Sequence, residues 1–247
     1  MEPCRILVLT SPKPDSIGGI PYILEKFPVE KFYSYLDLTH YTNWTLPEFR
    51  SLIKAIKISD ENLIPFYKSN FALYNSLSSA INKTAIFNLK KSKLLYEEFY
   101  KGKKLIIENI YPFNYELLGT EDDVGNNCPI IKITYGNKSF LLPFHISGDG
   151  EWMLIDALGE KLKSDVLCIP KHGDSSSSRT EFIEAVKPKF AVLQYGYLPK
   201  RNRLPYYIYE SEVMKTLERY KISNINILST SLYGALIFES DGRNLKY

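Results

Sequence analysis

A strand, a serine-rich loop, a helix and a second strand follow one another between residues 164 and 196, and this order constrains the fold most. The apolar run Val166–Ile169 is followed by a proline, which predicts a short buried strand. The loop Lys171–Ser177 is too rich in serine and glycine to lie inside a sheet. The run Phe190–Leu193 predicts the second strand. In α/β folds, a loop that follows the carboxyl end of a strand and opens into a helix commonly carries the functional site.

The helix between these two strands has its own start and stop signals. Ser178 and Glu181 have the spacing of a capping box, in which each side chain accepts a hydrogen bond from the other residue's backbone amide. Pro188 ends the helix. The apolar face that we expect to be buried carries Phe182, Ile183 and Val186.

The rest of the chain repeats this alternation of strands and helices and predicts an α/β fold. A tight turn at Gly136-Asn137 is expected to join two strands as a hairpin. The predicted strands are Arg5–Thr10, Lys31–Leu36, Leu105–Ile110, Pro129–Tyr135, Ser139–Phe144, Asn226–Leu228 and Ala235–Glu239. The predicted helices are Ile20–Phe27, Glu151–Leu162 and Glu210–Tyr220. Residues 41–102 are interpreted as a helical insertion within a single domain that spans residues 1–247.

Composition narrows the class of protein. The chain has 247 residues, 45% of them hydrophobic and 24% charged, which suits a large globular domain. Lys and Arg exceed Asp and Glu by 31 − 28 = 3, too few to indicate nucleic-acid binding by themselves. No apolar run reaches the roughly 20 residues that a membrane helix needs, and no signal peptide is present, so we expect a cytoplasmic, soluble protein. Three widely spaced cysteines predict free thiols, namely Cys4, Cys128 and Cys168.

Six blocks, in this order, resemble one family. They are LTSPKPDSIGGIP, NNCPIIKITYG, FLLPFHIS, SDVLCIPKHGDSSSS, EAVKPKFAVLQYG and GALIFESDG. Together they are similar to the metallo-β-lactamase-fold domain at the C-terminal end of the ComEC family of DNA-uptake competence proteins, from about Arg5 to Gly242. The resemblance implies an αββα sandwich with a metal site at one edge of its two sheets. Active relatives bind two metal ions, hydrolyse phosphodiesters and are thought to degrade the DNA strand that is not taken up.

The sequence departs from the family's metal-binding motifs. Where active relatives carry H-x-H-x-D-H, this chain has Ser11, Lys13, Asp15 and Ser16. His145 stands in place of the aspartate of T-G-D, Lys171 replaces the first histidine of H-H-G, and Arg203-Leu204-Pro205 replaces G-H-P. A two-metal site needs about six His and carboxylate ligands. The chain has three histidines in all, so we expect no bound metal cofactor and no two-metal hydrolase.

Two binding hypotheses remain for this region. Asp15, His145 and His172 form an acceptable ligand set for one Zn or Mn ion, although hydrogen bonding within the loops is the simpler explanation for them. Alternatively, basic and polar residues bind phosphate without metal, with tyrosines that suit stacking on single-stranded nucleic acid. The candidates for this second site are Lys13, Lys171, His172, Gly173, Ser175, Ser176, Lys200, Arg201 and Arg203.

The family resemblance also implies a shortened N-terminus, because relatives carry further strands before Arg5. A sheet that lacks those strands exposes an edge, which predicts a homodimer or a partner chain at this edge. We therefore interpret the chain as a metal-free, non-catalytic member of the fold that acts as a binding or scaffold module. The alternatives are a single-metal phosphodiesterase or nuclease and a purely structural subunit.

Overall fold

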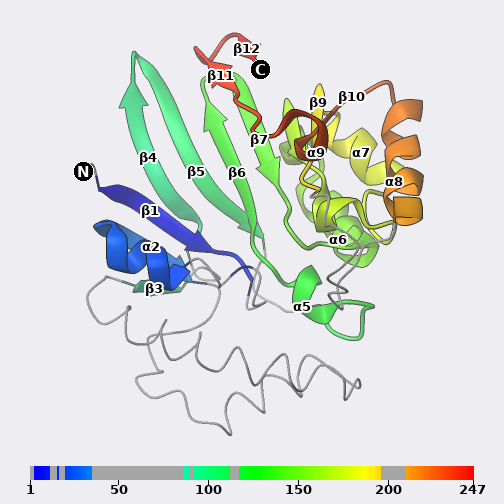
Figure 1. The fold of residues 1–247 in the computed structure, drawn as a ribbon, viewed down its shortest axis with the longest axis horizontal. Coiled ribbons are helices and arrows are strands. Elements are labelled where there is room, and N and C mark those ends of the chain that lie inside the picture. The colour runs from blue at the N-terminus through cyan, green and yellow to red at the C-terminus, as the bar shows by residue number, and fades with distance from the viewer. Residues whose placement is uncertain are drawn as a thin grey trace, which may run out of the picture. The chain divides into compact units, whose positions relative to one another are not determined.

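The computed structural model describes residues 3–11, 16, 20–34, 86–88, 92–111, 117–195 and 210–247. Within the chain, two compact units are distinguished, Met1–Lys93 and Leu94–Tyr247 (Figure 1). Each contains parallel strands and helices, which confirms the predicted α/β class. The prediction that all 247 residues form one domain stays a prediction.

The first unit contains a three-stranded parallel sheet in the order β1-β2-β3. Its elements are β1 (Cys4–Leu9), α2 (Ile20–Lys26), β2 (Val29–Ser34) and β3 (Ile86–Asn88). The strand–helix–strand order predicted for the start of the chain is therefore confirmed. Among the described residues β1 pairs with β2 alone, and a partner strand at its other edge stays a prediction.

The second unit is built on a seven-stranded mixed sheet in the order β10-β9-β8-β7-β6-β5-β4. Strands β4 to β7 pair antiparallel and strands β7 to β10 pair parallel. The strands are β4 (Leu94–Tyr100), β5 (Lys103–Tyr111), β6 (Ile130–Tyr135), β7 (Lys138–Leu142), β8 (Val166–Cys168), β9 (Phe190–Leu193) and β10 (Asn226–Ser229). A separate hairpin ends the chain, formed by β11 (Glu239–Ser240) and β12 (Leu245–Lys246).

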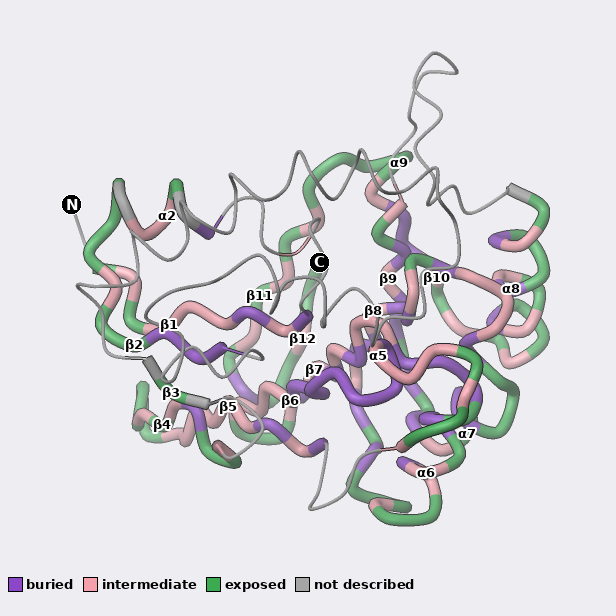
Figure 2. The backbone as a smooth tube through the Cα atoms, turned by 90° about the horizontal axis from the view of Figure 1, so that it is seen from below, coloured by how far each residue is buried: buried purple, intermediate pink, exposed green. Residues whose placement is uncertain are grey.

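Helical segments connect the parallel strands, which cannot be joined by a tight turn. These are α6 (Gly148–Leu158) with the 3₁₀ turn Gly159–Leu162, a second 3₁₀ turn at Pro170–Gly173 with α7 (Thr180–Val186), and α8 (Glu210–Ile222). Helix α5 (Asp123–Asn126) lies between the antiparallel strands β5 and β6, and α9 (Thr230–Tyr233) follows β10. The predicted apolar face of α7 is confirmed, because Phe182, Ile183 and Val186 are fully buried in the main core. Figure 2 shows the buried backbone concentrated at β7, β8 and the segments around them.

The predicted hairpin turn at Gly136-Asn137 is also confirmed, since it joins β6 to β7. Gly136 has a φ of +58°, and a Cβ atom there would lie 2.5 Å from the carbonyl oxygen of Gly242. The Asn137 amide donates to that same carbonyl at 2.7 Å. Glycine at this position therefore lets the end of the chain lie directly against the turn.

Two predictions of secondary structure are wrong. The expected helical insertion at residues 41–102 contains strands β3 and β4, because residues 94–100 pair antiparallel with β5. Residues 35–85 and 89–91 lie outside the described residues, so the rest of that prediction is untested. The expected strand Ala235–Glu239 is also wrong over most of its length, since pairing begins at Glu239.

The part of the chain that the structure describes contains no helix long and apolar enough to cross a membrane. All three cysteines are free thiols, as predicted. Burial raises the pKa of the Cys168 thiol to about 12, which keeps this thiol protonated and unreactive at neutral pH.

Candidate functional site

The loop that follows β8 has a strained backbone. Lys171 and His172 have φ angles of +47° and +54°, in the left-handed region that non-glycine residues rarely adopt. Gly173 has a φ of +89°, and a Cβ atom there would lie 2.9 Å from a Leu193 methyl carbon. The Lys171 amide donates to the Phe144 carbonyl at 2.7 Å, which ties this loop to the segment after β7. The backbone thus holds Lys171 and His172 in one conformation.

The Lys171 side chain is largely buried and lies between two polar groups. Its Nζ atom is 3.1 Å from Ser176 Oγ and 3.5 Å from Asp122 Oδ2, and the side chain is 17% exposed. The other oxygen of Asp122 accepts the Gly125 amide at the start of α5. Ser176 Oγ donates to Asp174 at 2.6 Å. The loop therefore holds a fixed ammonium group in a network of carboxylates and a hydroxyl.

Two histidines lie beside this ammonium-bearing loop. The rings of His145 and His172 are 6.1 Å apart between centroids, with an interplanar angle of 74°. His172 Nδ1 lies 3.0 Å from the carbonyl oxygen of Gln194, and since a carbonyl only accepts, this nitrogen carries the proton. In the neutral ring, Nε2 is then the unprotonated nitrogen, which is the state that a metal ligand or a proton acceptor needs.

The structure brings together two of the three predicted metal ligands, His145 and His172. The third, Asp15, lies outside the described residues. Within the described ranges, no group of three or more His, Cys, Asp or Glu side chains could hold a metal ion. The described residues therefore fit a metal ion only in part, through two imidazoles.

In residues 171–179, which we call the serine loop, four backbone amides already have acceptors. The Ser176 amide donates to Asp174 Oδ1 at 2.9 Å, and the Ser177 amide donates to the Asp174 carbonyl at 3.1 Å. The amides of Ser178 and Arg179 both donate to the carboxylate of Glu151. A phosphate that used these four amides would have to displace groups of the chain itself.

The predicted capping box is wrong. Helix α7 has Arg179 at its N-cap, and no side-chain cap forms there. Ser178 has a φ of +60°, and its hydroxyl accepts a hydrogen bond from Tyr220 at 3.0 Å. The Ser178 amide, which Glu181 was expected to accept, donates instead to Glu151 of α6, a residue distant in sequence.

Glu151 and Arg219 hold the serine loop together, and sequence reasoning missed both. Glu151 is fully buried, and its burial raises the pKa of its carboxyl group from 4.5 to about 7 against the hydrogen bonds from Arg179 and Ser178. Arg219 of α8 donates to three backbone carbonyls, at 2.5 Å to Ser177, 3.0 Å to Ser178 and 2.8 Å to Ser175. The signal in the sequence was a lone glutamate in the apolar face of a helix.

The structure describes one of the four tyrosines that we expect to stack on nucleic-acid bases. Tyr195 is partly buried, and its amide donates to Thr230 Oγ1 at 3.2 Å. The remaining basic candidates and three tyrosines lie outside the described residues: Lys13, Lys200, Arg201, Arg203, Tyr197, Tyr206 and Tyr207.

Comparison with known proteins gives two similar curated sequences. Competence protein ComA of Neisseria gonorrhoeae is 30% identical over 149 residues, which cover 57% of this chain and 20% of that protein. ComE operon protein 3 of Bacillus subtilis is 27% identical over 151 residues, which cover 60% of this chain and 18% of that protein. The chain thus matches about a fifth of the length of these relatives. No protein-family model matches the chain.

Among solved structures, zinc-bound PqqB of Methylobacterium extorquens is 14% identical, with a TM-score of 0.29, over 66% of this chain and 44% of that one. The two curated matches confirm the predicted resemblance to ComEC-like competence proteins, and the mixed sheet with its helices is consistent with the predicted α/β class.

Proposed function

We propose that this ComEC-like chain is a non-catalytic binding module and that single-stranded nucleic acid is its ligand. The observation that supports this proposal most is the Lys171 ammonium, which the strained loop holds where the resemblance implies a metal-ligating histidine. A fixed cation repels a metal ion but attracts a phosphate. The charge of this loop therefore suits binding of a nucleic-acid backbone rather than its cleavage.

The surroundings of Lys171 suit this role. The 3.5 Å separation from Asp122 is longer than a charge-assisted hydrogen bond of about 2.8 Å, so a phosphate oxygen can compete for the ammonium. His172, the next residue along the loop, is exposed. The predicted basic residues Lys13, Arg201 and Arg203 extend the same proposal to segments outside the described residues.

The proposal predicts salt-dependent binding that weakens when Lys171 is replaced. Between 50 and 200 mM salt, the affinity for a fluorescein-labelled 30-mer of deoxythymidine should fall steeply, because phosphate contacts release counterions. Lys171→Ala should weaken binding further and reduce the salt slope by about 0.7 for one lost contact. Fluorescence anisotropy measures both quantities. Lys161→Ala removes the same charge from an exposed turn and is the matched control. Equal binding by Lys171→Ala and the unaltered chain would contradict the proposed site.

A second candidate function is favoured by the histidine pair. His145 and His172 lie ring to ring, and the Gln194 carbonyl orients His172 with Nε2 unprotonated. With Asp15, they would supply one carboxylate and two imidazoles for a single Zn or Mn ion. Such an ion would supply Lewis-acid chemistry for phosphodiester hydrolysis.

Metal analysis separates the two functions. A complete metal site binds close to one ion per chain. For a metal-free module, we therefore expect a much lower content, less than about 0.1 ion per chain, after incubation with zinc or manganese. A content close to one ion per chain that is lost in His172→Ala, but kept in Lys161→Ala, would instead support the single-metal enzyme.

A further inference from the structure

The turn between β4 and β5 carries a second group of basic and aromatic side chains. We call it the hairpin-tip surface, and it consists of Phe99, Tyr100, Lys101, Lys103 and Lys104. The Lys101-Gly102 turn has φ angles of +48° and +74°, which is the backbone of a tight two-residue hairpin. Phe99 is 72% exposed and Tyr100 is 53% exposed. Two largely exposed rings thus follow one another in the chain at this hairpin turn.

The hairpin-tip surface lies at the opposite end of the sheet from the serine loop. Strand β7 begins at Lys138, beside the β6–β7 turn, and its carboxyl end leads to His145. The β4–β5 turn lies at the β6–β7 turn, because Leu105 pairs with Tyr135 and the Gly136 amide donates to the Lys104 carbonyl. Figure 1 shows the β4–β5 turn and the β11–β12 hairpin at one end of the seven-stranded sheet, and α5 at the other.

The backbone of the tip is held in place by a neighbouring tyrosine. Tyr135 donates its hydroxyl proton to the Tyr100 carbonyl at 3.0 Å, and the two rings lie 6.4 Å apart at an angle of 48°. The Lys101 ammonium lies 5.0 Å from the centroid of the Tyr100 ring, within the range of a cation–π interaction. A positive charge and an exposed aromatic face are therefore combined at one point.

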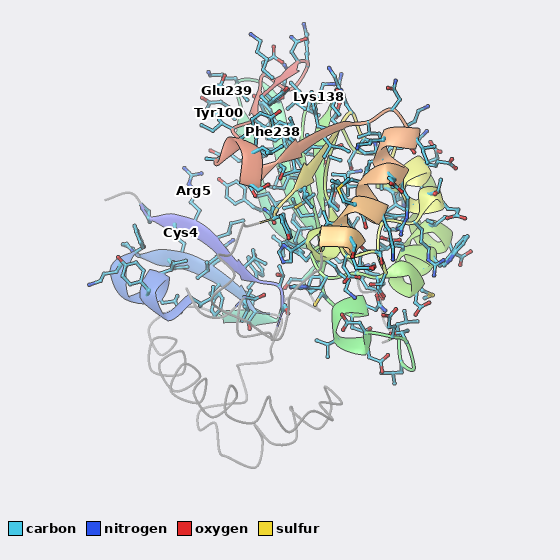
Figure 3. All side chains as sticks on the ribbon, turned by 45° about the vertical axis from the view of Figure 1, so that its right-hand side comes forward. Cys4, Arg5, Tyr100, Lys138, Phe238 and Glu239 are labelled. Atoms are coloured by element: carbon cyan, nitrogen blue, oxygen red, sulfur yellow. The ribbon has the colours of Figure 1, made fainter. Side chains whose placement is uncertain are left out.

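The C-terminal hairpin adds to this surface. Lys103 Nζ donates to the backbone carbonyl of Asp241, and Arg243 follows in the same turn with an exposed side chain. The Asp241 carboxylate accepts the amides of Arg243 and Asn244, which lowers its pKa well below the ordinary range. Figure 3 shows Tyr100, Lys138, Phe238 and Glu239 gathered at this end. Among the described residues the Asp241 side chain forms no ion pair with a lysine, but its negative charge still interacts with Lys103.

Cross-strand pairing places cations beside both rings. Tyr100 pairs with Lys103 and Phe99 pairs with Lys104, so each face of the hairpin carries one exposed ring and one lysine. Lys104 also forms an ion pair with Glu97 at 2.8 Å, whereas Lys103, on the face of Tyr100, shares that face with Glu98.

We propose that the hairpin-tip surface is a second contact for single-stranded nucleic acid, with a base stacked on Tyr100 and phosphates held by Lys101 and Lys103. Stacking on an aromatic face requires an unpaired base, which a duplex does not offer. A lipid surface is disfavoured, because Phe99 is the one purely apolar side chain of the five residues and offers little apolar area to insert. The class of ligand rests on the proposed function. The residues of this second contact, however, differ from those of the Lys171 site and lie at the opposite end of the sheet.

The test compares ring-removing and ring-keeping variants of the full chain. With the same labelled 30-mer in 50 mM salt, Tyr100→Ala should bind about 5- to 100-fold more weakly, as expected for a lost stacked base. Tyr100→Phe keeps the ring and should bind like the unaltered chain. Lys101→Ala should reduce the salt slope by about 0.7. The control Lys161→Ala should bind the 30-mer with the same affinity and salt slope as the unaltered chain.

Each outcome decides between the two sites. If Tyr100→Ala and Lys101→Ala bind like the unaltered chain while Lys171→Ala is weakened, the hairpin-tip proposal is overturned and the proposed function stands. If the hairpin variants are weakened and Lys171→Ala is not, the hairpin tip is the binding surface and the serine-loop site fails. The unaltered chain and the hairpin variants are also tested on vesicles of phosphatidylserine and phosphatidylcholine. If Tyr100→Ala and Lys101→Ala lose binding to these vesicles but bind DNA like the unaltered chain, the tip contacts a membrane surface and the proposal is overturned.

Discussion

Glu151→Ala is expected to lower the free energy of unfolding by about 3 kcal/mol, since two amide donors lose their acceptor. The carboxylate accepts the amides of Ser178 and Arg179, at the start of α7, from a fully buried position. Ser178 is itself buried, so water cannot replace the lost acceptor without opening the loop. Urea unfolding at pH 6, followed by circular dichroism, measures the change.

Glu181→Ala is the matched control for this substitution. The sequence predicts that Glu181 caps α7, whereas the structure leaves it exposed and assigns the cap to Glu151. An exposed position away from a cap should change stability by less than about 0.5 kcal/mol. A Glu181→Ala effect as large as that of Glu151→Ala would mean that the capping box forms after all and that the structural assignment is wrong.

Local patterns explain what the sequence predicted well. The strand and helix that flank the serine loop follow from short apolar runs and from the spacing of Phe182, Ile183 and Val186, which all pack in one core. The β6–β7 turn follows from Gly136-Asn137. Such signals reside within about ten residues of chain, so they can be identified without knowing the fold.

Strand β4 was missed because its period-two pattern is interrupted. The pairing register between β4 and β5 shifts between Leu94 and Tyr96, so buried and exposed side chains do not alternate regularly along residues 94–100. The helical interpretation of residues 41–102 includes Asn62–Tyr100, which is rich in Tyr, Asn, Ser and Lys, and so it extends across β4. A β-bulge of this kind is specified by the partner strand and is not visible in one strand alone.

The candidate site shows the same division between local and distant contacts. His145 and His172 could be expected near one another, because they follow the carboxyl ends of neighbouring parallel strands, β7 and β8. The contacts that define the loop are distant in sequence: Glu151 lies 27 residues before Ser178, and Arg219 lies 44 residues after Ser175. Nothing in a single sequence specifies such pairs.

The buried position of Glu151 also predicts a pH-dependent stability. Its carboxyl pKa is about 7 in the folded chain and 4.5 when unperturbed, so the folded state favours the protonated form. This contribution to stability is fully present below pH 4.5 and is lost as the pH rises through about 7. Over the whole window it amounts to about 3 kcal/mol, from 1.36 kcal/mol per pKa unit.

Glu151→Gln isolates this contribution, because the amide is neutral throughout and keeps one oxygen acceptor. Urea unfolding of both proteins between pH 4.5 and pH 8 should show the stability of the unaltered chain falling relative to that of Glu151→Gln. Groups distant from Glu151 contribute equally to both proteins and cancel in the difference. A difference that stays constant, or that grows in favour of the unaltered chain as the pH rises, would mean that Glu151 is ionised at all these pH values. The serine loop would then be held by a permanent negative charge, and Arg219 would be its electrostatic partner across the loop.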